Sequence, residues 1–203
     1  FWHVHAADYA REAVEHPVTD IVAVWDGQPE RGRAEAAARG LPFVDDLEAV
    51  LADPGIDGVI VTSATTAHSG IIPRAAAARK HVFVEKVIAP TLRESLAIVG
   101  AVERAGVTMT VALSRAREPA TGAIRQLIAD GRIGQPNSSR IRFAHDGALP
   151  TPDRPDGWLP VRFYDPDQSG GGAMIDFGAH PLYLTRLFLG LPETVTAVYG
   201  DVT

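Results

Sequence analysis

The 203-residue sequence predicts an α/β protein built on a doubly wound parallel sheet. Short apolar runs rich in Val and Ile alternate with stretches of helical period throughout residues 1–113. These runs are too short for helices and almost continuously apolar, which is typical of strands buried on both faces. Strands that alternate with helices in this way favour a parallel sheet with helices on both of its faces.

Five apolar runs are the expected strands, and the helices between them have recognisable ends. Pro29 suits the first turn of a helix, and Gly40 suits the position after the last turn. Asp46 is an N-cap residue, and Thr91 with Glu94 has the spacing of a capping box. The expected strands span residues 20–25, 43–44, 58–61, 81–84 and 108–113, and the expected helices span residues 5–14, 29–39, 47–52, 66–79 and 91–105.

The pattern changes after Leu113, so we expect one domain over residues 1–113 and a second over 114–203. The second should hold helices over 119–130 and 173–189, and strands over 140–145 and 194–199. Residues 146–169 contain many prolines and little periodicity, and a loop of that length is usually functional, for example as a lid. A strand pair and one helix cannot bury a second core, and the first helix begins almost at residue 1. We therefore expect both domains to be incomplete within these residues.

Composition excludes several classes of function. The formal net charge is −6, and no basic cluster suits a nucleic acid or an anionic membrane. The sequence has no cysteine, so disulfides, thiolate zinc sites and a cysteine nucleophile are excluded. No apolar run approaches the roughly 20 residues that span a bilayer, and residues 1–5 lack the pattern of a signal peptide. We expect a cytoplasmic protein.

Asp26 directly follows the expected strand 20–25. In a dinucleotide-binding fold, an acidic side chain at this place accepts hydrogen bonds from ribose hydroxyls and repels a 2′-phosphate. This favours NAD over NADP, although Arg31 and Arg33 could accept a phosphate. The alternative is an ordinary turn residue in an Asp-Gly pair.

Glu85 and Lys86 stand at the carboxyl end of strand 81–84, where open α/β sheets bind ligands. Lys86 is one of only two lysines, the other being Lys80, among 19 basic residues. A partly desolvated ammonium can polarise a substrate oxygen. The alternative is a surface ion pair.

Asp176 and His180 are four residues apart on the expected helix 173–189, so their side chains would share a face. A carboxylate bonded to an imidazole fixes its tautomer and raises its basicity, which suits a general base. The alternative is an Asp–His pair on a helix surface. The other histidines show no common spacing that would suggest a metal site.

The ordered set of motifs resembles the Gfo/Idh/MocA family of oxidoreductases over essentially the whole chain. The resemblance rests on residues 57–61 leading to 63–68, on Val84-Glu85-Lys86, on residues 131–134, and above all on Gly170-Gly171-Gly172 leading through Asp176 to His180. Two positions depart from the family pattern, because Val87 and Ala64 stand where proline is usual.

The resemblance implies a Rossmann domain followed by a C-terminal α/β domain with a mostly antiparallel open sheet, often the interface of a homodimer or homotetramer. It implies that Lys86 contacts nicotinamide and substrate, that His180 accepts the proton and that Asp176 supports it. The expected cofactor-binding residues are Phe1, Trp2, Asp26, Ser63, Ala64, His68, Glu85 and Lys86.

We therefore expect an NAD- or NADP-dependent enzyme that oxidises a CH–OH group of a sugar, inositol or related polyol. Lys86, Asp176 and His180 would be its reacting group, and no metal is expected. The expected substrate residues are Arg115, Trp158, Arg162 and Tyr164. Two alternatives remain open: an NAD-dependent glycosidase of the same fold and a non-catalytic NAD-binding regulatory protein.

Overall fold

A computed structural model describes residues 1–191, 194 and 196, and these fold into two compact units. The first unit consists of Phe1–Ala112 and His145–Asp176, and the second of Leu113–Ala144 and Phe177–Thr203. This differs from the single boundary expected after Leu113, because residues 145–176 pack with the first unit.

A parallel three-stranded sheet lies at the centre of the first unit. Its strands are β1 (Gly58–Val61), β2 (His81–Val84) and β3 (Met109–Val111), in the order β1-β2-β3. Val59 pairs with Val82 and Val84 with Val111, all in parallel register. The predicted parallel α/β architecture is thus confirmed.

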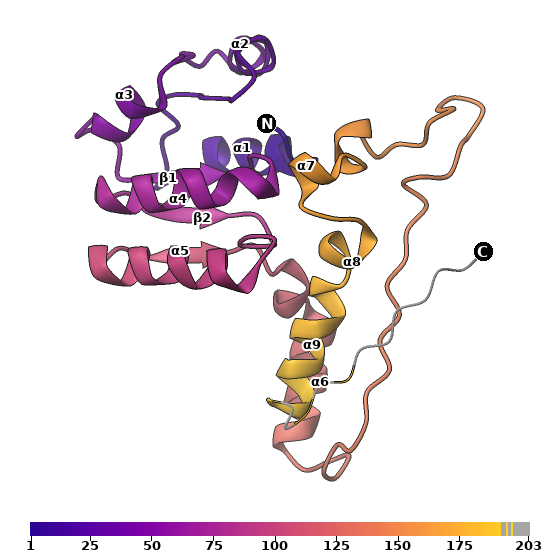
Figure 1. Cartoon of the computed structure of the whole chain (residues 1–203). Coiled ribbons are helices and arrows are strands. Elements are labelled where there is room, and N and C mark those ends of the chain that lie inside the picture. Colours follow the sequence, from indigo (N-terminus) through magenta and orange to yellow (C-terminus); the bar gives the residue numbers. More distant parts are fainter. Residues whose placement is uncertain (192–193, 195, 197–203) are drawn as a thin grey trace. The chain divides into compact units, whose positions relative to one another are not determined.

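Helices cover both faces of this sheet. Helices α4 (His68–Ala77) and α5 (Leu92–Ala105) lie side by side on one face (Figure 1), where Val82 and Val84 join Ile72 and Ile98 in the core. Neighbouring side chains of a strand point to opposite faces. Phe83 accordingly contacts Tyr9 of α1 (Ala6–Glu15), with ring centroids 5.1 Å apart.

Thr91 is confirmed as the N-cap of α5, but Glu94 bonds its hydroxyl in place of the backbone N–H that a full capping box engages. The Thr91 side chain accepts the backbone N–H of Glu94, and the Glu94 carboxylate lies 2.6 Å from the Thr91 hydroxyl. The helix ends at Gly106, whose φ of 64° is the left-handed conformation that glycine adopts at low cost.

The expected strands 20–25 and 43–44 are reduced to a single isolated parallel bridge between Val24 and Phe43. A strand needs a hydrogen-bonded neighbour, and a cavity of about 890 Å³ lies between residues 18–25 and β1. Its lining includes Ala6, Ala10 and Ala13 of α1. The apolar run therefore borders a cavity instead of extending the sheet.

The second half of the chain is poorer in strands than predicted. Residues 140–145 alternate in polarity but form no strand, because no neighbouring segment of the described chain pairs with them. The strand expected over 194–199 falls largely outside the described residues, and the open sheet of the second domain is not seen among those described. No helix in the described ranges is long and apolar enough to cross a membrane.

The helix expected over 173–189 is broken. Helix α8 (Ala173–Asp176) ends before Phe177, and α9 (Ala179–Leu189) begins after Gly178. Pro181 lies in the first turn of α9, where a proline costs least, and it has no N–H to donate to the carbonyl of residue 177. Proline alone does not force such a break, because α4 continues through Pro73. The remaining elements are α2 (Pro29–Ala38), α3 (Leu47–Ala52), α6 (Pro119–Ala129), α7 (Pro166–Ser169) and the short 3₁₀ turns Thr65–Ala67, Ser114–Arg117 and Val161–Phe163.

Candidate active site

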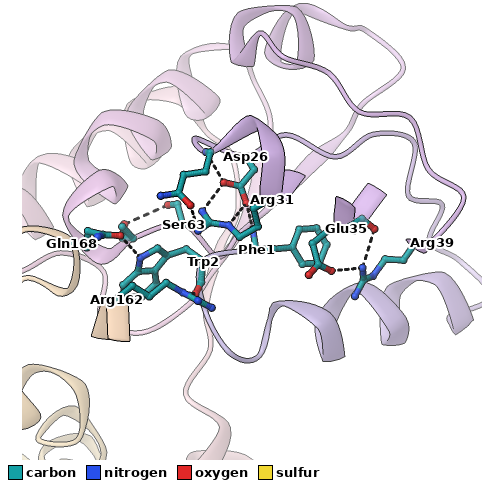
Figure 2. Close-up of polar contacts among 11 residues, drawn as sticks. Phe1, Trp2, Asp26, Arg31, Glu35, Arg39, Ser63, Arg162 and Gln168 are labelled. Carbon is teal, nitrogen blue, oxygen red and sulfur yellow. Dashed lines mark hydrogen bonds and ion pairs between the residues drawn. The ribbon is translucent and has the colours of Figure 1, made fainter. Parts of the chain in front are cut away.

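The Asp26 carboxylate is buried and accepts hydrogen bonds from Arg31 and Gln28 (Figure 2). Arg31 donates to both of its oxygens, at 2.8 and 2.6 Å, and the Gln28 N–H donates at 2.8 Å. Burial alone would raise the pKa of Asp26, but these hydrogen bonds outweigh it and hold the pKa below its usual value. Asp26 therefore remains an anion paired with Arg31.

Gly32 allows α2 to approach this carboxylate. A Cβ atom at Gly32 would lie 2.3 Å from the Phe43 ring and 2.8 Å from Asp26 Cβ. No local pattern predicts this close approach, since Gly32 lies inside helix α2. Arg33 instead pairs with the exposed Asp45, at 2.8 Å.

The large cavity brings together five of the expected cofactor-binding residues. Its lining contains Phe1, Trp2, Asp26, Ser63 and Ala64, but not His68, Glu85 or Lys86. Most of its lining is the apolar length of residues 18–25 and 56–61, so this cavity of about 890 Å³ runs along these segments. Dinucleotides bind beyond the carboxyl ends of such strands, and Asp26, Ser63 and Ala64 follow the carboxyl ends of these two segments.

Trp2 is held by residues 162–168, which belong to the proline-rich segment expected to form a loop or lid. Its indole N–H donates to Gln168 at 2.8 Å, its carbonyl accepts the Arg162 guanidinium at 2.6 Å, and its ring stacks on Phe163 with centroids 4.6 Å apart (Figure 2). Burial lowers the pKa of Arg162. Because it donates to the Trp2 carbonyl, Arg162 supports the wall of the cavity. Its position in a proline-rich stretch did not predict this role.

Glu85 is the centre of a buried hydrogen-bonded network. Its Oε1 accepts His5 at 2.9 Å and the Tyr9 hydroxyl, and its Oε2 accepts the backbone N–H of Lys86 at 2.9 Å. Burial alone would raise the pKa of Glu85, but the His5 bond, the neighbouring His3 and the Tyr9 bond lower it to about 2. Burial lowers the pKa of His3 to about 4, so His3 is neutral at pH 7.

His3, His5 and Glu85 bring potential metal-ligand atoms within 4.8 Å of one another. However, His3 Nδ1 already accepts the N–H of His5 at 3.2 Å, and both Glu85 oxygens have protein donors. A network satisfied in this way is complete without an ion, and we assign no metal to it.

Lys86 follows β2 and is held by Asp176. Its Nζ donates to the Asp176 carbonyl at 2.6 Å and also to the Asp176 carboxylate. The exposed fraction of Lys86 is 7%, and the cavity beside it, of about 10 Å³, has room for about one water. The peptide bond between Lys86 and Val87 is cis.

The prediction that Asp176 and His180 share one face of a single helix was wrong. The two residues lie on different helices, α8 and α9, which Phe177 and Gly178 separate. Asp176 is paired with Lys86 in the first unit. The His180 ring belongs to the second unit, where its Nδ1 lies 2.9 Å from the Tyr183 hydroxyl.

His180 is buried among aromatic side chains of the second unit. It stacks on Phe143, with ring centroids 4.8 Å apart, and the Tyr183 hydroxyl that it contacts also accepts the backbone N–H of Arg115 at 3.2 Å. Burial raises the pKa of Tyr183, so the hydroxyl stays protonated at neutral pH. The three-residue spacing of His180 and Tyr183 on one helix could have predicted this pair.

The other expected substrate residues have different surroundings. Trp158 donates its indole N–H to Asp146 at 2.9 Å, and Tyr164 is half exposed. The guanidinium of Arg115 lies over the Phe143 ring, 5.5 Å from its centroid, and pairs with Glu118. Of these three, Arg115 lies in the same unit as His180, and the other two lie in the first unit.

A buried carboxylate after the bridged segment 20–25 and a lysine after strand β2 of a parallel α/β sheet are the features of a dinucleotide-binding protein of Rossmann type. Sequence comparisons agree. A family model described as "Oxidoreductase family, NAD-binding Rossmann fold" matches residues 4–113, and a model described as "GFO/IDH/MocA C-terminal domain" matches residues 121–203. The chain belongs to the Gfo/Idh/MocA oxidoreductase family.

Individual relatives support this assignment. The chain is 34% identical over 189 residues to scyllo-inositol 2-dehydrogenase (NAD(+)) of Bacillus subtilis, which covers 92% of the chain and 51% of the relative. A solved putative myo-inositol dehydrogenase from Sinorhizobium meliloti is 26% identical with a TM-score of 0.67, over 90% of this chain and 51% of that one. A levoglucosan dehydrogenase in complex with NADH and levoglucosan is 26% identical with a TM-score of 0.73, over 92% and 52%. The chain thus spans about half the length of these relatives.

Proposed function

We propose that the protein is an NAD-dependent oxidoreductase that oxidises a secondary alcohol of a sugar, inositol or related polyol. The observation that carries the proposal is Lys86, a nearly buried ammonium at the carboxyl end of β2 that is bonded to Asp176. The relatives named for inositol and levoglucosan support the substrate class.

The proposed roles follow from the chemistry of the side chains. Asp26 binds the ribose hydroxyls, and Phe1, Trp2, Ser63 and Ala64 line the space for the nucleotide. When bound, the nicotinamide supplies the hydride acceptor. Lys86 stabilises negative charge as it develops on the substrate oxygen, and Asp176 holds the Lys86 ammonium in place.

His180 is the proposed acceptor of the hydroxyl proton. To accept at Nε2, the neutral ring has to carry its hydrogen on Nδ1, and the Tyr183 oxygen at 2.9 Å is placed to accept that hydrogen. Tyr183 is therefore proposed to help orient the His180 ring through this bond.

The experiment is a substrate panel. The purified protein is mixed with NAD or NADP and with inositols, aldoses, deoxy sugars or 1,6-anhydro sugars, and nicotinamide reduction is followed by absorbance in the near ultraviolet. The proposal expects reduction with at least one group of polyols and a preference for NAD. Tight NAD binding without reduction across the panel would contradict it.

The same experiment separates the other readings. Release of a free sugar from an aryl glycoside without accumulation of NADH would instead mark an NAD-dependent glycosidase. NAD binding with neither activity would mark a regulatory protein. A homodimer or homotetramer and a cytoplasmic location stay predictions.

A further inference from the structure

His68 does not line the cofactor cavity, although it was expected to bind the cofactor. It is the first residue of α4, only 1% exposed, and its Nδ1 lies 3.1 Å from the carbonyl oxygens of both Val87 and Ile88. These two carbonyls belong to the residues that directly follow Lys86. The ring is therefore attached to the backbone turn that carries the lysine.

The chemistry of the contact fixes the tautomer of His68. Both neighbours of Nδ1 are carbonyl oxygens, which only accept, so Nδ1 has to carry a hydrogen. Burial lowers the pKa of His68, although the carbonyls of Ile88 and Val87 oppose this, so the ring stays neutral at pH 7. A neutral ring with its hydrogen on Nδ1 is a fixed, uncharged clamp on two carbonyl groups.

The turn is restrained on both sides of Lys86. Val87 stands where a proline ring would restrict the backbone, while Ile88 and Ala89 pack against the core. On the preceding side, the Lys86 N–H donates to Glu85 at 2.9 Å. The Lys86 N–H is thus bonded by Glu85, and the carbonyls of the two following residues are bonded by His68.

We propose that His68 is a positioning residue that holds the turn after Lys86 and so keeps the Lys86 ammonium on Asp176, where the reaction needs it. The predicted effect of His68 on turnover rests on the proposed function. The predicted effect of His68 on the position of Lys86 does not depend on any activity. His68 acts through the backbone and touches neither substrate nor cofactor.

Three variants separate the hydrogen bond from simple packing. Asparagine carries an amide N–H donor the same number of bonds from Cα as Nδ1, whereas glutamine carries it at the place of Nε2. His68→Asn should therefore keep the clamp, and His68→Gln and His68→Leu should lose it. His16→Asn is the matched control, since His16 is exposed at the end of α1.

The first readout is the reactivity of Lys86 without any substrate. Competitive acetylation, followed by peptide mass spectrometry, compares Lys86 with Lys80, whose ammonium is held by the carbonyls of Asp53 and Ile56 at 2.6 and 2.7 Å. Loss of the clamp should raise the labelling of Lys86 relative to Lys80 at least threefold in His68→Leu and His68→Gln. His68→Asn and His16→Asn should match the unaltered protein.

The second readout is steady-state kinetics with the substrate that the panel identifies. A misplaced reacting group can cost about a hundredfold in rate, so kcat should fall by about tenfold to a hundredfold in His68→Leu, with the Kd of NAD within about twofold. His68→Asn should recover most of kcat.

The outcomes are distinct. Equal Lys86 labelling in all variants would overturn the positioning role, whatever the activity. Equal losses of kcat in His68→Asn, His68→Gln and His68→Leu would also overturn it, because they would show that His68 acts through packing alone. If the unaltered protein reduces no nicotinamide, the proposed function fails, but the labelling pattern still decides the role of His68.

Discussion

At the scale of single residues, the carboxylate of Asp26 is neutralised by Arg31 and is not an isolated negative charge. An isolated carboxylate would repel a 2′-phosphate, but a guanidinium beside it can offset that repulsion. Arg31→Ala should therefore weaken NADP binding relative to NAD by about tenfold, which is about 1.4 kcal/mol.

Titration calorimetry with both dinucleotides measures this ratio. Arg33→Ala is the control, because Arg33 pairs with Asp45 on the surface, and its ratio should not change. An NADP-to-NAD ratio in Arg31→Ala equal to that of the unaltered protein would show that Arg31 has no part in cofactor choice.

The Tyr183 hydroxyl forms a hydrogen bond with the proposed base His180. Tyr183→Phe removes this bond and leaves the aromatic ring, so the orientation of the His180 ring should be less restrained. We expect kcat to fall about tenfold with KM almost unchanged. General base catalysis contributes roughly a hundredfold or more to the rate, and a less well oriented base should lose part of that contribution.

The dependence of kcat on pH checks the assignment. The limb of the pH–kcat profile that reflects ionisation of the base should shift in Tyr183→Phe. The midpoint of thermal unfolding should change little. An unchanged rate and pH profile would exclude Tyr183 as the residue that orients the base.

At the scale of elements, helix ends with local signals were predicted well. Pro29 and Asp46 do begin helices α2 and α3, and the Thr91 N-cap begins α5. The break between α8 and α9 was not predicted, because residues 173–189 were expected to form one helix. Pro181 is not a sufficient signal for the break, because Pro73 lies inside the continuous helix α4.

The N-cap of α5 gives a direct test at this scale. Thr91→Ala removes the acceptor for the Glu94 N–H and should lower the free energy of unfolding by about 1 kcal/mol. Thr91→Ser keeps a hydroxyl and should restore most of the loss. Urea unfolding of the three proteins measures both, and equal stabilities would show that the cap contributes nothing.

At the scale of the whole molecule, the buried network around Glu85 links α1 to β2 and makes stability depend on pH. The folded pKa of His3 is about 4, against a usual value of 6.5, so the unfolded chain binds more protons between these values. The folded pKa of Glu85 is also lowered, to about 2, so protonation again favours the unfolded chain below pH 4.5. Both groups stabilise the fold at neutral pH and lose this effect as the pH falls.

The free energy of unfolding should therefore decrease on acidification from pH 6.5 to 4, by roughly 2 to 3 kcal/mol from His3. His3→Gln should flatten this part of the profile, and the exposed His16→Gln should leave it unchanged. A profile that stays equally steep in His3→Gln would assign the dependence to other groups.

The sequence predicted the parallel sheet and the family, because apolar runs and ordered motifs are local features. Strand ends are local features too, and on them rest the predicted roles of Asp26 and Lys86, which stay predictions. It could not predict that Asp176 binds Lys86, that Arg162 supports Trp2, or that His68 clamps the turn after Lys86. These contacts join residues between 19 and 160 positions apart. Which residues meet in these contacts depends on tertiary packing, and no local sequence pattern predicts it.

The most direct test of the account is a single-turnover measurement of nicotinamide reduction by the unaltered protein and by Lys86→Ala. Both proteins are first saturated with NAD, with the Kd of each measured, and then mixed with the polyol that the panel identifies. We expect a burst of reduced nicotinamide from the unaltered protein and at least a hundredfold slower reduction from Lys86→Ala, with similar Kd values. Reduction by Lys86→Ala at the rate of the unaltered protein would contradict the account.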